Sequence, residues 1–253
     1  MLYIVATPIG NLKDISMRAI EALRACDFII AENPNYSKRL LQYIDALPVI
    51  ARRSAADDEA IHSKKKIASP LEDSGLAMTR KEIVQFAEFN EQQVVKDITR
   101  RLMKNDGCLI TDAGTPGISD PGFRLVRECV KNNIQVVPIP GANAAIAALS
   151  ASGLPTDKFL FLGFLQKTAT KTVEALQATA DAEATAIFYE SPERILKTIS
   201  YISNAFPTSQ VVVARELTKI HEEFIRGTPM QVMDNLKNRP SIKGELTVLI
   251  SFK

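Results

Sequence analysis

Three turns rich in glycine, proline and hydroxyl side chains carry the strongest chemical signal in this chain. They lie at residues 7–11, 111–120 and 140–144, and each follows a short apolar run typical of a buried parallel strand. The carboxyl ends of parallel strands meet along one edge of a sheet, where exposed backbone amides suit a ligand-binding crevice. The pattern therefore predicts a ligand that is bound by turns.

The turn at 111–122 is the most informative of the three. Between Gly114 and Gly122 it contains three glycines and two prolines, more backbone irregularity than helix or strand packing requires. Asp120 and Pro121 have the residue types of a helix N-cap and first turn, so we expect a helix to start there. An ordinary strand-to-helix turn is the alternative interpretation.

Other kinds of site have little support in the sequence. His62 and His221 are the only histidines, they lie far apart, and neither has a His or Cys at metal-ligand spacing. The sequence has no G-x-S-x-G nucleophile elbow and neither of the two glycine-rich phosphate-binding motifs. We expect no metal, and a ligand with an adenine face, a ribose diol and an amino-acid end would fit turns that lack a phosphate site.

The elements that must position these turns follow from the apolar periodicity. In residues 1–155, continuous apolar runs alternate with helical spacing, which predicts an α/β domain with a mainly parallel sheet; the expected strands are 2–6, 28–31, 108–111 and 134–139. A second α/β domain is expected over 156–253, where alternating strands favour a mixed sheet. Between about 46 and 84 the chain is polar and we expect an exposed, mobile insertion.

Composition sets broad limits. The chain has 253 residues, 46% of them hydrophobic, and a net charge of +2, which neither requires nor excludes a nucleic-acid partner. The three cysteines, Cys26, Cys108 and Cys129, have no paired spacing and are expected to be buried free thiols in a reducing cytoplasm. No stretch approaches the roughly 18 apolar residues of a membrane span.

Several motifs together resemble a known family. Their order along the chain is similar to that of the ribosomal RNA small subunit methyltransferase I proteins of the tetrapyrrole methylase superfamily. The motifs are Thr7-Pro8-Ile9-Gly10-Asn11-Leu12, Thr111-Asp112-Ala113-Gly114-Thr115-Pro116, Ile118-Ser119-Asp120-Pro121-Gly122, Pro138-Ile139-Pro140-Gly141, residues 150–156, Phe188-Tyr189-Glu190-Ser191-Pro192 and Ala214-Arg215-Glu216-Leu217-Thr218-Lys219. The resemblance covers nearly the whole chain except about 46–84.

The resemblance implies an S-adenosylmethionine-dependent methyltransferase of two α/β domains with the cofactor in a cleft between them, and a homodimer. In that family the acceptor is the 2′-hydroxyl of a cytidine ribose in 16S ribosomal RNA of the small subunit. By motif, the residues implied to line the cofactor site are Pro8, Asp112, Gly114, Thr115, Ile118, Asn143, Phe164, Tyr189, Ala214 and Arg215.

Methyl transfer from a sulfonium requires the nucleophile, the methyl carbon and the sulfur to lie in line. A ribose hydroxyl must also lose its proton, and the sequence offers Glu190 and Glu216 as proton acceptors or orienting groups. Arg215 and Lys219 would contact phosphate or substrate. For each of these charged residues, a structural ion pair is the alternative interpretation.

Two motifs depart from the family pattern. Where the family has Ala-Glu-Asp-Thr-Arg, this chain has Ala31-Glu32-Asn33-Pro34-Asn35, and a His-Glu-His-Asn-Glu motif reads Ala87-Glu88-Phe89-Asn90-Glu91. The cofactor turns are thus better kept than segments expected near the substrate. Two alternatives therefore stand beside methylation of ribosomal RNA: methylation of a tetrapyrrole, and a cofactor-binding, ribosome-associated protein with weakened catalysis.

Overall fold

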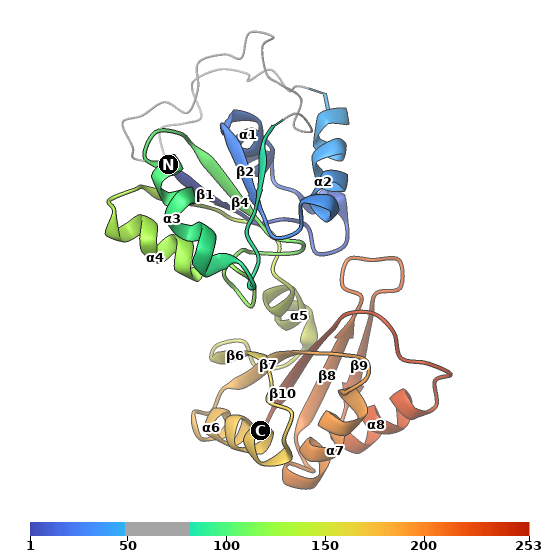
Figure 1. Ribbon diagram of the computed structural model, residues 1–253. Helices are drawn as coiled ribbons and strands as arrows, with labels where there is room; N and C mark the ends of the chain where they lie inside the picture. The colour runs from blue at the N-terminus through green and yellow to red at the C-terminus, as the bar shows by residue number, and fades with distance from the viewer. Residues whose placement is uncertain (49–80, 253) are drawn as a thin grey trace. The chain divides into compact units, whose positions relative to one another are not determined.

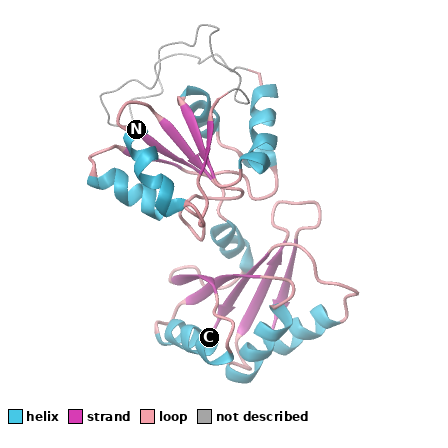
Figure 2. Ribbon diagram, in the orientation of Figure 1, coloured by secondary structure: helices cyan, strands magenta, loops and turns pink. Residues whose placement is uncertain are grey.

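A computed structural model describes residues 1–48 and 81–252. The chain divides into two compact units, one of Met1–Thr7 with Leu12–Gly141 and one of Pro8–Asn11 with Ala142–Lys253. Most of the insertion expected at 46–84 lies outside the described residues. Figures 1 and 2 show that each unit is built from a sheet with helices packed on it.

The first unit has a sheet whose described strands all run parallel, in the order β3-β2-β4-β1-β5. The strands are β1 (Leu2–Val5), β2 (Phe28–Ala31), β3 (Ile83–Gln85), β4 (Gly107–Ile110) and β5 (Val136–Ile139). All four residues of β2 and of β4 are buried, as expected for strands covered on both faces. The mainly parallel sheet predicted for this part of the chain is confirmed.

Helices cover both faces of this sheet. The first core cluster joins residues of α1 (Met17–Ala25) and α2 (Pro34–Ala46) to one face. The second joins α3 (Glu91–Leu102) and α4 (Phe123–Lys131) to the other. A short 3-10 helix, η1 (Leu12–Asp14), precedes α1. Cys26, Cys108 and Cys129 are buried free thiols, as predicted.

The predicted start of α4 at Asp120 and Pro121 is wrong, since the helix begins at Phe123. The carbonyl of Pro121 accepts a hydrogen bond from Gly117 N at 3.2 Å, which holds this proline in the loop. Gly122 then has φ 149°, a conformation outside the helical region. Loop closure therefore overrides the local helix-start signal.

The second unit has a mixed sheet in the order β6-β7-β10-β8-β9, as predicted. Among the described strands of this second sheet, only β6 and β7 pair in parallel. The strands are β6 (Phe159–Phe164), β7 (Thr185–Glu190), β8 (Gln210–Arg215), β9 (Glu223–Gly227) and β10 (Leu246–Ser251). Helix α5 (Ala144–Ser152) covers one face, and the other face is covered by α6 (Ala169–Asp181), α7 (Ile195–Ala205) and α8 (Pro229–Lys237).

Helix α5 explains why the unit boundary lies at Gly141, earlier than the 155/156 boundary expected from sequence. Its small residues Ala145 and Ala148 are buried in one cluster with Ile187, Val212 and Leu249 of the second sheet. The alanine-rich sequence thus permits close packing of this helix on the sheet. The helix belongs to the second unit by its contacts.

Candidate functional site

The first and second predicted turns are joined by a backbone clasp. Thr7 N donates to Gly114 O at 2.8 Å, and Gly114 N donates to Thr7 O at 3.1 Å. The Thr7 hydroxyl donates to Thr111 O at 3.1 Å. The ends of β1 and β4 are therefore held together, as expected for turns at one edge of a parallel sheet.

The loop after β4 owes its glycines to backbone conformation. Gly114 and Gly117 have φ of 87° and 84°, in the left-handed region that glycine adopts without strain. Ser119 also has a positive φ, 61°. The Ile118 side chain between them is 44% exposed, so this loop presents both backbone and an apolar side chain at the surface of its unit.

Three carboxylates interact at the end of β4. Burial, followed by the charge of Glu32, raises the pKa of Asp112 to about 6. Burial also raises the pKa of Asp120 to about 6, with further contributions from Glu32 and Asp112. Asp112 N donates to Glu32 Oε2 at 3.3 Å. Asp112 Oδ1 is buried and has no hydrogen-bond partner among the described residues, so it can accept a hydrogen bond from a ligand.

The altered motif at 31–35 has a structural role at the start of α2. Asn33 is the N-cap of α2, and its side chain accepts from Asn35 N and Tyr36 N at 3.1 and 3.3 Å. Pro34 occupies the first helical turn, where its missing N–H costs nothing. The replacement residues therefore start the helix efficiently.

Glu91, in the other altered motif, supports the loop after β4. Its Oε1 accepts from Gly122 N at 3.4 Å and Arg124 N at 3.3 Å, while Oε2 pairs with Arg124 Nε at 3.3 Å. The Gly122 cap has no side chain to satisfy the first amides of α4. Sequence reasoning missed this role, because Glu91 is distant from the loop along the chain.

The third turn is also closely packed. A Cβ at Gly141 would lie 2.8 Å from Ala6 Cβ, so glycine is required for this approach in the first unit. Asn143, in the second unit, is the N-cap of α5 and accepts from Ile146 N at 3.2 Å. The side-chain oxygen of this predicted cofactor contact thus already serves the helix.

An aromatic group lies on the α5 side of the second sheet. The Tyr189 ring meets Phe161 and Phe164 edge to face, at centroid distances of 5.0 and 5.7 Å. Phe164 is 60% exposed, whereas Ala214 is fully buried on the same face. The predicted cofactor residues Phe164, Tyr189 and Ala214 therefore lie on one side of this unit.

The pleat of the strands places the next residues on the opposite face. Glu190 follows Tyr189 and Arg215 follows Ala214, so their side chains point toward α7 and α8. Glu190 is 3% exposed and accepts from the Thr198 hydroxyl at 2.6 Å. Its other oxygen accepts from Ser191 N at 2.9 Å and pairs with Arg194 at 3.4 Å. Both oxygens of Glu190 are thus engaged inside the second unit.

Glu216 and Lys219 form an ion pair in the loop between β8 and β9. Lys219 Nζ donates to Glu216 Oε1 at 2.8 Å and to Glu245 Oε2 at 3.1 Å. The hydrogen bond from Lys219 lowers the pKa of Glu216. Glu216 also accepts from Glu245 N at 3.0 Å. A carboxylate with these partners is a weak proton acceptor.

The first turn packs on this same loop. A Cβ at Gly10 would lie 2.6 Å from Lys219 Cγ and 2.9 Å from Leu217 O. Asn11 N donates to the Thr218 hydroxyl at 3.1 Å. The two motifs, distant in sequence, thus form one structural group with Pro8, which is buried in the second unit.

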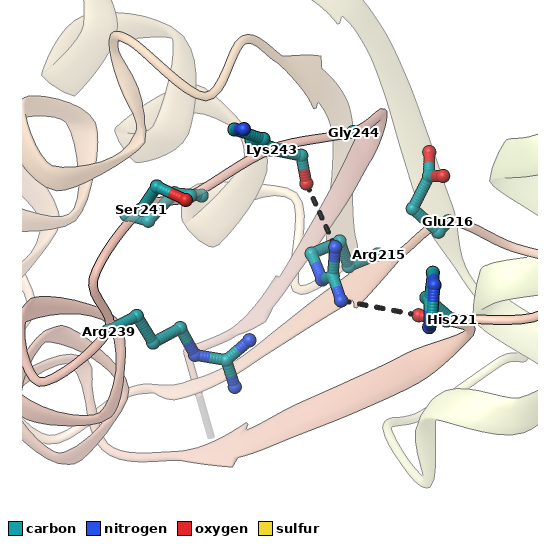
Figure 3. A pocket seen from close by; sticks show the side chains of 8 residues that line it. Arg215, Glu216, His221, Arg239, Ser241, Lys243 and Gly244 are labelled. Carbon is teal, nitrogen blue, oxygen red and sulfur yellow. Dashed lines mark hydrogen bonds between the residues drawn. The ribbon is translucent and has the colours of Figure 1, made fainter.

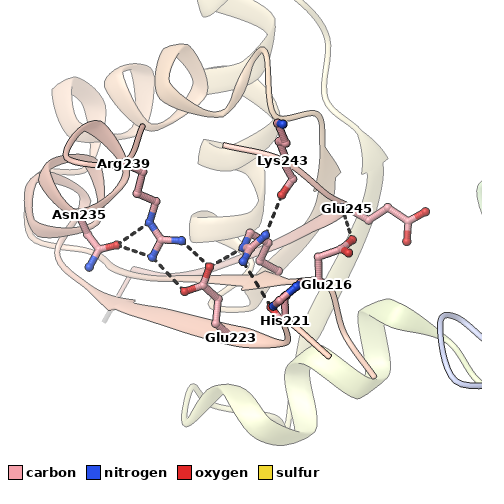
Figure 4. A network of polar contacts seen from close by, with 8 residues as sticks. Glu216, His221, Glu223, Asn235, Arg239, Lys243 and Glu245 are labelled. Carbon is pink, nitrogen blue, oxygen red and sulfur yellow. Dashed lines mark hydrogen bonds and ion pairs between the residues drawn. The ribbon is translucent and has the colours of Figure 1, made fainter. Parts of the chain in front are cut away.

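A cavity of about 300 Å³ opens on the side of Arg215. Figure 3 shows the Arg215 guanidinium donating to Lys243 O at 3.0 Å and His221 O at 3.4 Å. Glu223 accepts from both Arg215 and Arg239, and its contact with Arg239 appears in Figure 4. The hydrogen bond from Arg239 is the main cause that lowers the pKa of Glu223 to about 2.

Within residues 1–48 and 81–252, no group of three or more His, Cys, Asp and Glu side chains is placed to hold a metal ion. In the same residues, no helix is long and apolar enough to cross a membrane.

Comparison with known proteins gives consistent matches. The sequence profile of the tetrapyrrole (corrin/porphyrin) methylases matches residues 1–232. The chain is similar to the ribosomal RNA small subunit methyltransferase I of Halalkalibacterium halodurans, with 38% identity over 250 residues that cover 98% of this chain and 75% of the relative. The same-named protein of a Hydrogenobaculum species is 38% identical over 99% of this chain and 95% of the relative.

Among solved structures, the fold is similar to that of a diphthine synthase. The TM-score is 0.68 at 14% sequence identity, and the match covers 99% of this chain and 89% of that chain. At this level of identity the likeness concerns the fold.

Proposed function

Because the chain belongs to the tetrapyrrole (corrin/porphyrin) methylases, and within them to the ribosomal RNA small subunit methyltransferase I family, we propose that it methylates a cytidine ribose of 16S ribosomal RNA. The acceptor is the 2′-hydroxyl, and the methyl donor is S-adenosylmethionine. The family makes the protein a methyltransferase; the donor, the nucleotide and the position on the ribose are our proposal.

One observation carries the cofactor proposal in the first unit. Asp112 Oδ1 is buried without a partner beside the backbone clasp of Thr7 and Gly114. A buried oxygen without a hydrogen bond costs free energy, which a ligand hydroxyl or ammonium group would recover. We therefore assign cofactor contacts to Asp112 and to the loop residues Gly114, Thr115 and Ile118.

In the second unit, the proposed contacts are Pro8, Asn143, Phe164, Tyr189 and Ala214. The exposed Phe164 ring and its neighbour Tyr189 offer apolar surface to an adenine or a methionine chain. Arg215 can contribute only its backbone to this face, because its side chain lies on the other side of the sheet.

The bound donor would supply a methyl group on a sulfonium. The protein must then orient the ribose hydroxyl in line and accept its proton. Asp112 and Asp120, each with a pKa of about 6, suit proton transfer near neutral pH better than Glu216, whose pKa is lowered by the hydrogen bond from Lys219, or Glu190, which is buried with both oxygens engaged. We propose that one of the two aspartates accepts the proton.

We further propose that the protein acts in the cytoplasm, on the small ribosomal subunit or its RNA, as a homodimer. Sedimentation equilibrium at micromolar concentration tests the oligomer. We expect twice the chain mass of 27.8 kDa, and a mass of one chain would contradict the dimer.

Two measurements test the proposed activity in order. Calorimetry with S-adenosylmethionine should give saturable binding heat, and its absence at high ligand concentration would remove the cofactor. Labelled methyl groups should then enter 16S RNA in 30S subunits or naked 16S RNA, and nuclease digestion should yield 2′-O-methylcytidine. Binding of S-adenosylmethionine without methyl transfer to either RNA would favour the alternative of a ribosome-associated protein with weakened catalysis. Methyl transfer to a tetrapyrrole alone would favour the alternative of a tetrapyrrole methyltransferase.

A further inference from the structure

The cavity beside Arg215 lies away from the residues assigned to the cofactor. Arg215 and Glu223 point toward the α7 and α8 side of the second sheet, whereas Ala214 and Phe224 belong to the cluster under α5. Strand alternation keeps these two faces separate within the unit. A ligand in this cavity would therefore be distinct from a cofactor that contacts Tyr189 and Ala214.

Some hydrogen-bond donors at the cavity have no acceptor among the described residues. A guanidinium carries five N–H groups. Arg215 uses three of them, on Glu223 and on the carbonyls of Lys243 and His221. Arg239 uses four, on Glu223 and Asn235. Among the described residues, three guanidinium N–H groups at this cavity thus have no acceptor.

Two further donors line the same cavity. The Ser241 hydroxyl and the Lys243 ammonium group have no hydrogen-bond or ion-pair partner among the described residues, and both side chains are exposed. Side chains from the end of β8, the segment after α8 and the segment before β10 therefore line one cavity, and in Figure 3 the Lys243 ammonium group points away from the Arg215 and Arg239 guanidinium groups. Donors without acceptors in the lining of a cavity are the chemistry of an anion site.

The net charge of the side chains at and around the cavity indicates which kind of anion would bind. Cations exceed carboxylates by one in the set formed by Arg215, Lys219, Arg239 and Lys243 with Glu216, Glu223 and Glu245. One surplus charge matches a phosphodiester, which carries a single negative charge, better than a phosphate monoester, whose charge at pH 7 is about −1.5 to −2. We propose that this cavity binds a backbone phosphate of the substrate RNA.

This inference rests on the proposed RNA substrate, so the experiment separates the two. The probe is a 16S ribosomal RNA transcript, and its affinity is measured against salt concentration for the full chain. We expect Lys243→Ala to weaken binding about tenfold at low salt and to reduce the slope of log K against log salt by about 1. Combination with Ser241→Ala should weaken binding further.

Lys158→Ala is the matched control. Lys158 is exposed in the same unit and directly precedes β6. Phe159 of β6 pairs with Thr185 at the start of β7, whereas Leu246 pairs with Glu190 at the end of β7 and with Arg215 at the end of β8. Lys158 therefore lies at the end of the sheet opposite to Arg215. Its RNA affinity and salt slope should equal those of the wild type. Calorimetry should give the same S-adenosylmethionine affinity for all variants.

The outcomes are distinct. If wild type binds the transcript and Lys243→Ala binds it with the same affinity and slope as Lys158→Ala, the cavity does not contact RNA. If inorganic phosphate at millimolar concentration raises the melting temperature of wild type but not of Lys243→Ala, while RNA binding is unchanged, the anion is free phosphate. If wild type binds S-adenosylmethionine but no RNA, the proposed substrate fails together with this inference.

Discussion

At the scale of single residues, the carboxylates of this protein differ in what their environments allow. Asp112 is partly exposed and has a buried oxygen without a partner, whereas Glu190 is buried with both oxygens engaged. The sequence places both in motifs shared with the family, and it cannot distinguish them. Their burial and hydrogen-bond partners do, because these decide whether an oxygen is available to a ligand.

Asp112→Asn should separate stability from binding. The pKa of Asp112 is raised from 3.8 to about 6 in the folded protein, so the folded state binds more protons between these values and stability falls as pH rises through that window. The variant should therefore melt higher than wild type at pH 7, and the difference should vanish below about pH 4. Its cofactor affinity should fall by about tenfold.

Differential scanning calorimetry from pH 4 to pH 8 and titration with S-adenosylmethionine measure these two effects. A variant that is less stable at pH 7 than wild type would contradict the assigned cause of the pKa. Unchanged cofactor affinity would remove Asp112 from the binding site.

Glu190→Gln should act on stability. The amide cannot accept equally well from the Thr198 hydroxyl, Ser191 N and Arg194, so unfolding should become easier by about 1 to 3 kcal/mol. Urea denaturation measures this loss, and Glu193→Gln, at an exposed neighbour, should change it little. A loss of methyl transfer by folded Glu190→Gln, without a loss of stability, would instead make Glu190 a catalytic group.

At the scale of elements, loops that are far apart in sequence support one another. The α4 helix starts where Glu91 of α3 supplies the acceptor that its glycine cap lacks. The turn at Gly10 fits against Leu217 and Thr218 in the loop after β8. The loop after β4 and the turn at Gly10 are therefore each held by a segment distant in sequence, and Gly10 leaves no room for a Cβ against Leu217.

Glu91→Ala should loosen the loop after β4. Gly122 N and Arg124 N lose their acceptor, and the free energy of unfolding should fall by about 1 to 3 kcal/mol. Hydrogen exchange should speed up in residues 114–124, and S-adenosylmethionine binding should weaken. Glu88→Ala, at an exposed position in the same motif, is the control. Equal exchange in both variants would show that Glu91 does not hold the loop.

Gly10→Ala should displace the loop between β8 and β9. The new methyl would overlap the backbone oxygen of Leu217, 2.9 Å away, which cannot move as a flexible side chain can. We expect a loss of about 1 to 3 kcal/mol in stability. Gly153→Ala is the comparison, because a Cβ there has open space and meets only the strain of φ 81°. Equal losses would show that close approach at Gly10 is unimportant.

At the scale of the whole molecule, the chain forms two units and passes between them more than once. Residues Pro8–Asn11 leave the first unit directly after β1 and join the second. Ile9 is accordingly buried with Leu149 and Val212, whereas Val5 is buried in the first unit with Ile29 and Cys108.

Ile9→Ala and Val5→Ala should therefore destabilise different units. Ile9→Ala should cost about 2 to 5 kcal/mol and increase native-state hydrogen exchange in α5, β8 and β10, whereas Val5→Ala should increase exchange in β1, β4 and β5. Mass spectrometry of the exchanged peptides measures both changes in hydrogen exchange. Faster exchange of β1, β4 and β5 in Ile9→Ala, with α5 unaffected, would contradict the assignment of Ile9 to the second unit.

The sequence by itself determined the α/β class, the parallel and mixed sheets and the turns at strand ends, because apolar periodicity and glycine or proline positions act locally. It did not predict β3, whose three residues are too few for a clear periodic signal. Only the tertiary structure decided that α5 belongs to the second unit, since that assignment depends on packing against distant strands.

For the candidate site, the turn after β4 was identified by its sequence, because Gly114 and Gly117 adopt positive φ angles that glycine reaches with the least strain. The sequence did not show which charged side chains near this turn have an oxygen available to a ligand. Sequence motifs grouped Tyr189 with Glu190 and Ala214 with Arg215, but strand pleating places adjacent side chains on opposite faces, and long-range partners then decide which carboxylates remain open to a ligand.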